Sequence, residues 1–526
     1  MLLILISIFI LLAFAGGYFL YRSRRPYYLY LEIESFPEEV PSVSPLYSLF
    51  SRKKPWTFSR FIYALNNLKG DRAFRGIFID LSRYRLNLSQ TYELRETLRR
   101  LKEGRKIICY STWYSEPAYY LATICDEIYM APSGYIEIPG LVMQNMYFRE
   151  LFDTLNIIPQ FVHKEEYKSA VEPFTRREPS KYDLEQRKRL MDIYYENLVK
   201  ALRERGIDEP DSLINNYAIL YGKETERAGL TDGLVYKDSV EDILKEKFRG
   251  ARRVRGVKIR RGSLFARNKV VVVVANGPIV DADTYNPLEE STTIGTGLAE
   301  VLRKLHKDKS VKAVVLRVNS PGGSALTSDI IAHEIRKLAR DKLVVVSMGL
   351  VAASGGYYIS TYANRIFLNP FTITGSIGVL YGKLAMEDFF RNKLHINPFV
   401  MNKGDMADAL TMKPLDEKEL KRLDEFIDEI YGDFLRVVSE GRNMPVDSVR
   451  EVAKGRIWVG KDAIRVGIAD TIGTVADAIE FARSRVGRSR VVFLKRRYRT
   501  RMDLLSLLAF SKESVWMVDF RLLFLR

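Results

Sequence analysis

Short apolar runs alternate with longer amphipathic stretches along most of the chain. In the first half, apolar runs predict strands at Gly76–Asp80 and Lys106–Cys109. Apolar positions recur with helical spacing in Tyr92–Lys102 and again in Tyr182–Arg205. Strands that alternate with helices are typical of an α/β fold with mostly parallel sheets.

The second half shows the same alternation. Strands are predicted at Val270–Val274, Val314–Leu316, Leu343–Val346 and Ile366–Leu368, and a long helix at Asp416–Glu440. We therefore expect a second α/β unit.

The two halves also repeat individual residues at a constant spacing of 238 positions. The matching pairs are Tyr119 and Tyr357, Pro132 and Pro370, Phe161 and Phe399, Gly222 and Gly460, and Gly229 and Gly467. A constant offset predicts two tandem domains of one fold. We place these domains at residues 58–248 and 269–485, joined by a basic linker at 249–268.

The regions outside the repeats differ in character. Leu2–Leu20 is almost wholly apolar, which predicts an uncleaved transmembrane anchor within residues 1–22. Residues 23–57 include a stretch rich in Pro and Ser and are predicted to form a linker or arm. Residues 486–526 are predicted to form a C-terminal tail, and its apolar, aromatic part (Leu504–Leu525) could cover a domain face, contact another subunit or rest on a membrane.

Composition adds a strong positive charge but little support for nucleic-acid binding. The net charge of +17 is concentrated in Arg252–Arg261 and Arg483–Arg501, without zinc-ligand spacing or an RNA-binding motif. Solvated linkers or contact with anionic lipid headgroups explain such clusters better. A nucleic-acid binder remains an alternative, and it would bind with a steep salt dependence.

Three turns of small residues carry the candidate chemistry: Arg317–Ser324 (RVNSPGGS), Ala352–Tyr358 (AASGGYY) and Thr374–Gly378 (TGSIG). Ser354 follows a predicted strand and precedes a helix, where backbone N–H groups can stabilise an oxyanion. This position suits a nucleophile. Gly323 and Gly355 are the candidate oxyanion donors, with Gly322 as a further candidate, and Ser376 supplies a free hydroxyl in the third turn.

All four histidines lie outside these turns, which disfavours a Ser-His-Asp triad and a histidine-rich metal site. These residues are His163, His306, His333 and His395. We expect neither a metal nor a cofactor. The two cysteines, Cys109 and Cys125, are expected to be small buried residues.

The three turns resemble those of the signal peptide peptidase A family, also known as protease IV, whose fold is related to the Clp protease subunit and the crotonases. Tyr167–Pro173 (YKSAVEP) is similar to the segment that holds the general-base lysine of the long, two-repeat form. The resemblance implies a serine endopeptidase in which Lys168 activates Ser354 and Ser376 orients the lysine. It also implies hydrophobic peptide substrates such as cleaved signal peptides, and a ring-like homotetramer.

The resemblance and the charge pattern disagree on membrane topology. Arg22, Arg24 and Arg25 follow the anchor, and the positive-inside rule would place the body in the cytoplasm. The resemblance implies a single-pass protein of the cytoplasmic (inner) membrane with its catalytic domains on the extracytoplasmic side. We favour the latter because long domains can override a local charge bias.

The repeats differ in the residues that matter for catalysis. At an offset of 238, Ser354 corresponds to Glu116, and Lys168 corresponds to Met406. One half keeps the serine and the other keeps the lysine, so we predict a dyad assembled across the domain junction. Lys403, three positions before Met406, is a rival base that would make the second domain self-sufficient.

Two further functions fit the same architecture. A catalytically inactive scaffold would keep the fold while Lys168 and Ser354 stay apart. A crotonase-type acyl-CoA enzyme would share the oxyanion turn but would bind CoA and need no nucleophilic serine.

Overall fold

The computed structural model describes residues 25–38, 56–257, 266–282, 285–286, 291–404 and 406–494. The predicted anchor, much of the predicted arm and most of the predicted tail lie outside these residues. Among the described residues, no helix has the length and apolar character needed to span a bilayer.

The first half of the chain forms a six-stranded sheet in which every neighbouring pair is parallel. Its order is β8-β4-β3-β2-β1-β9. The strands are β1 (Tyr27–Glu32), β2 (Phe74–Asp80), β3 (Lys106–Ser111), β4 (Glu127–Met130), β8 (Gly233–Leu234) and β9 (Arg252–Arg255).

The second half forms an eight-stranded sheet. Its main path is β18-β16-β14-β13-β10-β20, with β15 beside β14 and β19 beside β15, and only β16 and β18 pair antiparallel. The strands are β10 (Asn268–Asn276), β13 (Val311–Ser320), β14 (Leu343–Ala353), β15 (Arg365–Leu368), β16 (Ile373–Gly375), β18 (Ile457–Val459), β19 (Thr471–Ile472) and β20 (Ser489–Phe493). The predicted α/β fold with two mostly parallel sheets is thus confirmed.

The sheets follow one topology. The order β9-β1-β2-β3-β4-β8 corresponds strand by strand to β20-β10-β13-β14-β15-β19. The equivalence reaches single hydrogen bonds: Tyr119 donates its hydroxyl to the Leu230 carbonyl (2.8 Å), and Tyr357 donates to the Ile468 carbonyl (3.1 Å). The two tyrosines are 238 positions apart, and so are the two residues whose carbonyls accept. The recurring tyrosines therefore serve packing.

Helices cover the faces of both sheets, and further helices pack against short strands outside them. Those of the first half are α3 (Phe58–Asn66), α4 (Leu88–Leu101), α5 (Glu116–Ala122), α6 (Arg149–Leu155), η1 (Ser169–Val171), α7 (Glu172–Thr175), α8 (Lys181–Arg205), α9 (Pro210–Asn216), α10 (Lys223–Arg227) and α11 (Lys237–Lys247). Those of the second half are α12 (Gly297–Lys307), α13 (Ala325–Asp341), α14 (Gly355–Tyr358), α15 (Glu387–Lys393), η2 (Ala407–Leu410), α16 (Glu417–Arg442), α17 (Val446–Ala453), α18 (Lys461–Arg465) and α19 (Val475–Val486).

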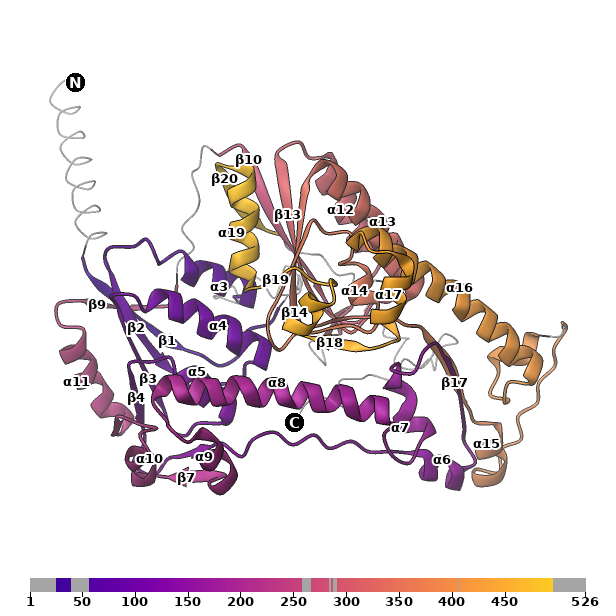
Figure 1. Cartoon of the computed structure of the whole chain (residues 1–526), viewed down its shortest axis with the longest axis horizontal. Coiled ribbons are helices and arrows are strands. Elements are labelled where there is room, and N and C mark those ends of the chain that lie inside the picture. Colours follow the sequence, from indigo (N-terminus) through magenta and orange to yellow (C-terminus); the bar gives the residue numbers. More distant parts are fainter. Residues whose placement is uncertain are drawn as a thin grey trace, which may run out of the picture.

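The two repeats share one hydrophobic core. Side chains of α3 and α4 pack in the same cluster as α19 and as one face of the second sheet, including Val272 and Val315. The opposite face of that sheet packs against α12, α13, α14 and α16. Figure 1 shows α3, α4 and α19 between the two sheets, and the long α8 running beneath both. The repeats are therefore held in one fixed arrangement.

A buried ion-pair cluster reinforces this contact beside the glycine turn. Arg317, in the second half of β13, is fully buried and pairs with Glu93 of α4 (2.7 Å) and with Glu38 (3.1 Å). Burial raises the pKa of Glu93 to about 7, although Arg317 opposes that shift. The cluster links the first repeat to the strand that leads into Gly322.

Short strand pairs complete the fold. The remaining strands are β5 (Tyr135–Glu137), β6 (Ile158–His163), β7 (Ile219–Tyr221), β11 (Tyr285–Asn286), β12 (Ser291–Thr292) and β17 (Leu380–Ala385). Of these, β6 belongs to the first repeat and β17 to the second, and they pair antiparallel from His163–Leu380 to Ile158–Ala385. This ribbon carries first-repeat residues to the second sheet.

Candidate active site

Ser354 occupies a strained turn between β14 and α14. Its backbone has φ 53° and ψ −122°, a conformation that non-glycine residues rarely adopt. The Ser354 N–H donates to the Gly375 carbonyl at 2.9 Å, which ties this turn to the end of β16. The surrounding packing maintains this strained conformation, which places the Ser354 hydroxyl at the carboxyl end of the parallel strand β14.

The Gly322–Gly323 turn lies directly against Ser354. A Cβ on Gly322 would lie 2.6 Å from the Gly355 nitrogen and 2.8 Å from the Ser354 Cβ. A Cβ on Gly323 would lie 2.1 Å from the Ile279 carbonyl oxygen, and both glycines have positive φ. Only glycine fits this turn without moving its neighbours.

The three candidate oxyanion donors are not equivalent. The Gly322 N–H donates to the Ser320 hydroxyl at 3.2 Å, so it is already engaged. Within the described part of the chain, no acceptor is recorded for the N–H of Gly323 or of Gly355, which is the first residue of α14. Gly323 and Gly355 are therefore available to a substrate oxyanion, while Gly322 shapes the turn.

The ribbon of β6 and β17 delivers Lys168 to this turn. The Tyr167 N–H donates to the Lys454 carbonyl at 3.0 Å. The next residue, Lys168, packs directly against Gly455, and a Cβ added to Gly455 would lie 2.7 Å from the Lys168 Cβ. A side chain at position 455 would push the lysine segment away. Gly455 thus permits the first repeat to enter the site of the second.

Lys168, Ser354 and Ser376 meet at the end of this path. The Lys168 Nζ donates to the Ser376 hydroxyl (2.9 Å) and the Ser376 carbonyl (3.0 Å), and lies 3.3 Å from the Ser354 Oγ. The Lys168 side chain is buried, and among the described residues no carboxylate lies within ion-pair distance of its amine. Burial lowers the pKa of Lys168 to about 7.

This geometry can activate a hydroxyl. A lysine with a pKa near 7 is largely unprotonated at slightly alkaline pH and can accept a proton from a hydroxyl within hydrogen-bond reach. Ser376, whose own φ is 49° and whose N–H donates to the Arg456 carbonyl at 2.7 Å, fixes the position of the amine.

Gln186 of α8 supports the lysine segment, and sequence reasoning missed it. Its amide nitrogen donates to the Tyr167 carbonyl (3.2 Å) and the Ser169 hydroxyl (2.9 Å), and its oxygen accepts from the Ile457 N–H (3.0 Å). One buried amide therefore links α8, the lysine segment and β18. No motif marks a single glutamine on a long amphipathic helix.

The positions equivalent to the candidate site have other roles. Glu116, the counterpart of Ser354, accepts hydrogen bonds from the Tyr194 hydroxyl and from the Gly140 N–H (3.0 Å) in the first repeat. The rival base Lys403 is exposed in a loop, and no contact with Ser354 is recorded for it within the described residues. Among those residues, no group of three or more His, Cys, Asp or Glu side chains could hold a metal ion.

Comparison with known proteins defines the class. Residues 99–249 and 336–488 match peptidase family S49, one match in each half of the chain. The chain is 31% identical to Protease 4 of Haemophilus influenzae over 451 residues, covering 81% of this chain and 72% of that protein. It is 30% identical to the chloroplastic serine protease SPPA of Arabidopsis thaliana over 431 residues, covering 79% of this chain and 64% of that protein.

The chain belongs to peptidase family S49 and is a serine protease with two repeats, which confirms the resemblance read from the three turns. Among solved structures, a point mutant of ClpP1 from Listeria monocytogenes aligns with 40% of this chain and 94% of its own length, at 17% identity and a TM-score of 0.26. That score is too low to define the fold by itself.

Proposed function

We propose that the protein is a membrane-anchored serine endopeptidase in which Ser354 is the nucleophile and Lys168 the general base. The observation that carries this proposal is the 3.3 Å approach of the Lys168 amine to the Ser354 hydroxyl, in a site that disfavours the charged form of the amine. The base comes from the first repeat and the nucleophile from the second.

The proposed reaction proceeds through an acyl-enzyme. The Ser354 Oγ attacks the peptide carbonyl while its proton passes to the Lys168 Nζ. The N–H groups of Gly323 and Gly355 stabilise the resulting oxyanion. Lys168 then protonates the leaving amine, and afterwards it deprotonates the water that hydrolyses the ester.

Hydrophobic peptides, such as cleaved signal peptides, are the proposed substrates. The ribbon that leads to Lys168 carries exposed apolar side chains, including Ile158 of β6 and Tyr381 of β17. Such a two-stranded ribbon can accept an extended peptide as a further strand. We further propose that this protein is anchored in the cytoplasmic membrane, with its two catalytic repeats on the extracytoplasmic side.

A homotetramer is proposed for the assembled enzyme. Several large apolar side chains between α15 and α16 are strongly exposed, among them Phe399 (88%), Met401 (86%) and Leu410 (88%). Apolar side chains gathered in one exposed segment are typical of a contact surface. Subunit contacts there would bury them.

The substrate class can be tested with the full-length protein in a neutral detergent. We expect cleavage within the apolar stretch of a synthetic signal peptide, little cleavage of a polar peptide of equal length, and none of either by Ser354→Ala. Equal cleavage of both peptides would contradict the proposed specificity. No cleavage of any peptide would favour the inactive scaffold.

The pH profile should report the buried lysine. Since the unprotonated amine is the active form and burial lowers the pKa of Lys168 to about 7, kcat/KM should rise with pH, level off above neutrality, and fall about tenfold per unit below it. The measurement is kcat/KM for one peptide across about pH 5 to 10. An inflection near the ordinary pKa of lysine would contradict a buried, neutral base.

A further inference from the structure

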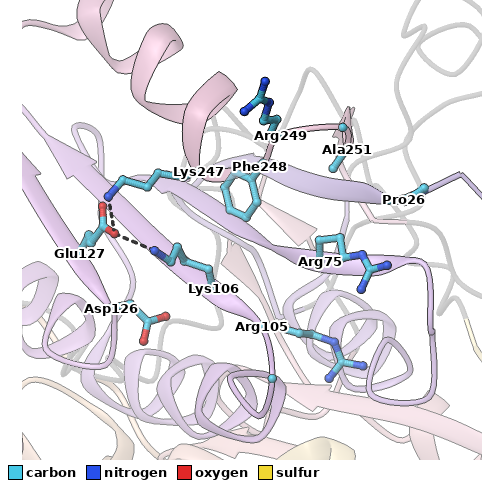
Figure 2. Close-up of a pocket in the computed structure, with 12 residues that line it drawn as sticks. Pro26, Arg75, Arg105, Lys106, Asp126, Glu127, Lys247, Phe248, Arg249 and Ala251 are labelled. Carbon is cyan, nitrogen blue, oxygen red and sulfur yellow. Dashed lines mark hydrogen bonds and ion pairs between the residues drawn. The ribbon is translucent and has the colours of Figure 1, made fainter.

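A basic cavity lies at the amino-terminal edge of the first sheet, remote in sequence from Ser354 and Lys168. Because β1, β2, β3 and β4 are parallel, their starting residues gather at one edge. The cavity has a volume of about 840 Å³. The residues around it are Pro26, Arg75, Gly104, Arg105, Lys106, Asp126, Glu127, Lys247, Phe248, Arg249, Gly250 and Ala251 (Figure 2).

Positive charge in this cavity exceeds negative charge. Five cationic side chains line it against two carboxylates, and Glu127 already pairs with both Lys106 and Lys247, each at 2.9 Å. Asp126 accepts from the Ile107 N–H (2.7 Å) and pairs with Lys102 outside the cavity (3.1 Å). Neither carboxylate is therefore left to neutralise the arginines.

The three arginines have no carboxylate within ion-pair distance among the described residues. Arg75 and Arg249 are exposed. Arg105 lies over the Phe74 ring, and its guanidinium already donates to four backbone carbonyls, those of Lys69 (2.8 Å), Phe74 (3.4 Å), Glu103 (3.5 Å) and Asp71 (3.5 Å). In the view of Figure 2, Arg75 and Arg105 lie on one side of Phe248, and Glu127 with its two lysines on the other. Exposed guanidinium groups, such as those of Arg75 and Arg249, can bind phosphate oxygens through paired hydrogen bonds.

The cavity is built on fixed elements. The Phe248 ring stacks on Tyr28 with centroids 4.4 Å apart. The Pro26 carbonyl accepts from the Arg252 N–H at 2.9 Å, and the Tyr27 N–H donates to the Ala73 carbonyl at 2.9 Å. The point at which the chain enters the first sheet is therefore pinned to the rim of the cavity.

This entry point also limits the distance to the apolar N-terminal segment. Pro26 on the rim lies six positions after Leu20, the end of that segment. A fully extended chain of that length spans about 20 Å at most. If Leu2–Leu20 crosses a bilayer, the cavity is held close to the headgroup layer, which is roughly 5–8 Å thick on each side.

We propose that this cavity binds the phosphodiester headgroup of an anionic phospholipid from the membrane in which the N-terminal segment is embedded. The tether keeps such headgroups at high local concentration, and the excess of arginine selects a negative one. A bound headgroup would orient the first sheet relative to the membrane. The proposal depends on the predicted anchor but not on the peptidase chemistry.

Calorimetric titration can test the proposal on the full-length protein in a neutral detergent. The probes are short-chain phosphatidylglycerol, short-chain phosphatidylcholine, inorganic phosphate and a ten-nucleotide single-stranded DNA. We expect saturable binding of one phosphatidylglycerol, at least about tenfold weaker binding of phosphatidylcholine and phosphate, and at least about tenfold weaker phosphatidylglycerol binding by Arg75→Glu/Arg249→Glu.

A matched control changes the same charge elsewhere. Arg422→Glu/Arg436→Glu alters two exposed arginines of α16 and should bind phosphatidylglycerol like the wild type. If Arg75→Glu/Arg249→Glu unfolds at a lower temperature than the wild type, the milder variant Arg75→Gln/Arg249→Gln is used in its place. The proposal would be overturned if the control variant lost as much affinity for phosphatidylglycerol as the cavity variant. It would also be overturned if phosphate or DNA bound as tightly as the lipid, or if no saturable binding were found. Cleavage of a soluble peptide, measured in parallel, tests the peptidase separately.

Discussion

Lys168→Met should abolish nearly all peptidase activity and at the same time stabilise the fold near neutral pH. Removing a general base from a serine nucleophile is expected to lower kcat/KM by about 10³-fold or more. The gain in stability follows from the cost of burying an amine, since burial lowers the pKa of Lys168 from 10.5 to about 7. At pH values between about 7 and 10.5, Lys168 is protonated in the unfolded chain but not in the folded one.

The sign of the effect follows from that proton. The stability of the wild type should rise with pH from about 7 towards 10.5, and below this window the full cost of the buried amine is present. Methionine carries no such cost, so the free energy of unfolding at pH 7 should rise by roughly 1–4 kcal/mol, less at pH 10. Denaturant unfolding at both pH values and peptide kinetics measure the two effects.

Lys403→Met is the matched control for this prediction. Lys403 is exposed, so its replacement should leave activity and stability close to those of the wild type. Loss of activity in Lys403→Met, with activity kept in Lys168→Met, would assign the base to the second repeat.

Gly323→Ala should lower kcat by about 10²-fold with a smaller change in KM. Its φ of 142° is unfavourable for alanine, and the new Cβ would lie 2.1 Å from the Ile279 carbonyl oxygen. The turn must move, and the Gly323 N–H moves with it, away from the place where the oxyanion forms. Steady-state kinetics on one peptide, with thermal unfolding to verify the fold, measure this.

Gly432→Ala provides the control for a glycine replacement. Gly432 lies within α16, and an added Cβ there meets nothing within 4 Å. Activity should be unchanged, and stability should be equal or higher by up to about 1 kcal/mol, because alanine favours helix more than glycine does. Wild-type kcat in Gly323→Ala would show that this turn does not form the oxyanion hole.

The long elements were predictable from periodicity alone. The helix predicted at Tyr182–Arg205 is α8 (Lys181–Arg205), and the helix predicted at Asp416–Glu440 is α16 (Glu417–Arg442). Both carry apolar positions at helical spacing over many turns, so their signal is strong. The central strands were found equally well because each contains a short run of apolar residues, many of them β-branched, that is buried on both faces.

The edge strands were not predictable. β1, β9 and β20 lie in segments that the sequence assigned to the arm, the basic linker and the tail. β9 (Arg-Arg-Val-Arg) is nearly all arginine and forms a strand only because β1 offers a parallel partner, from Tyr27–Arg252 to Tyr30–Arg255. Tertiary pairing here outweighs local propensity.

The candidate site was only partly predictable from the sequence. The repeat offset showed that one half keeps the serine and the other the lysine, but it could not show that they meet, since Lys168 and Ser354 are 186 positions apart. That meeting depends on the pairing of β6 with β17 and on the space left by Gly455. Neither feature has a periodic or motif signal.

The most direct test of the central claim is the rate and the site of labelling by a fluorophosphonate, mapped by mass spectrometry of the digested protein. A dyad of Ser354 and Lys168 predicts a single adduct on Ser354, none in Ser354→Ala, labelling slowed by about 10²-fold or more in Lys168→Met, and wild-type labelling in Lys403→Met. An adduct on another serine, or undiminished labelling of Ser354 in Lys168→Met, would contradict a site assembled from both repeats.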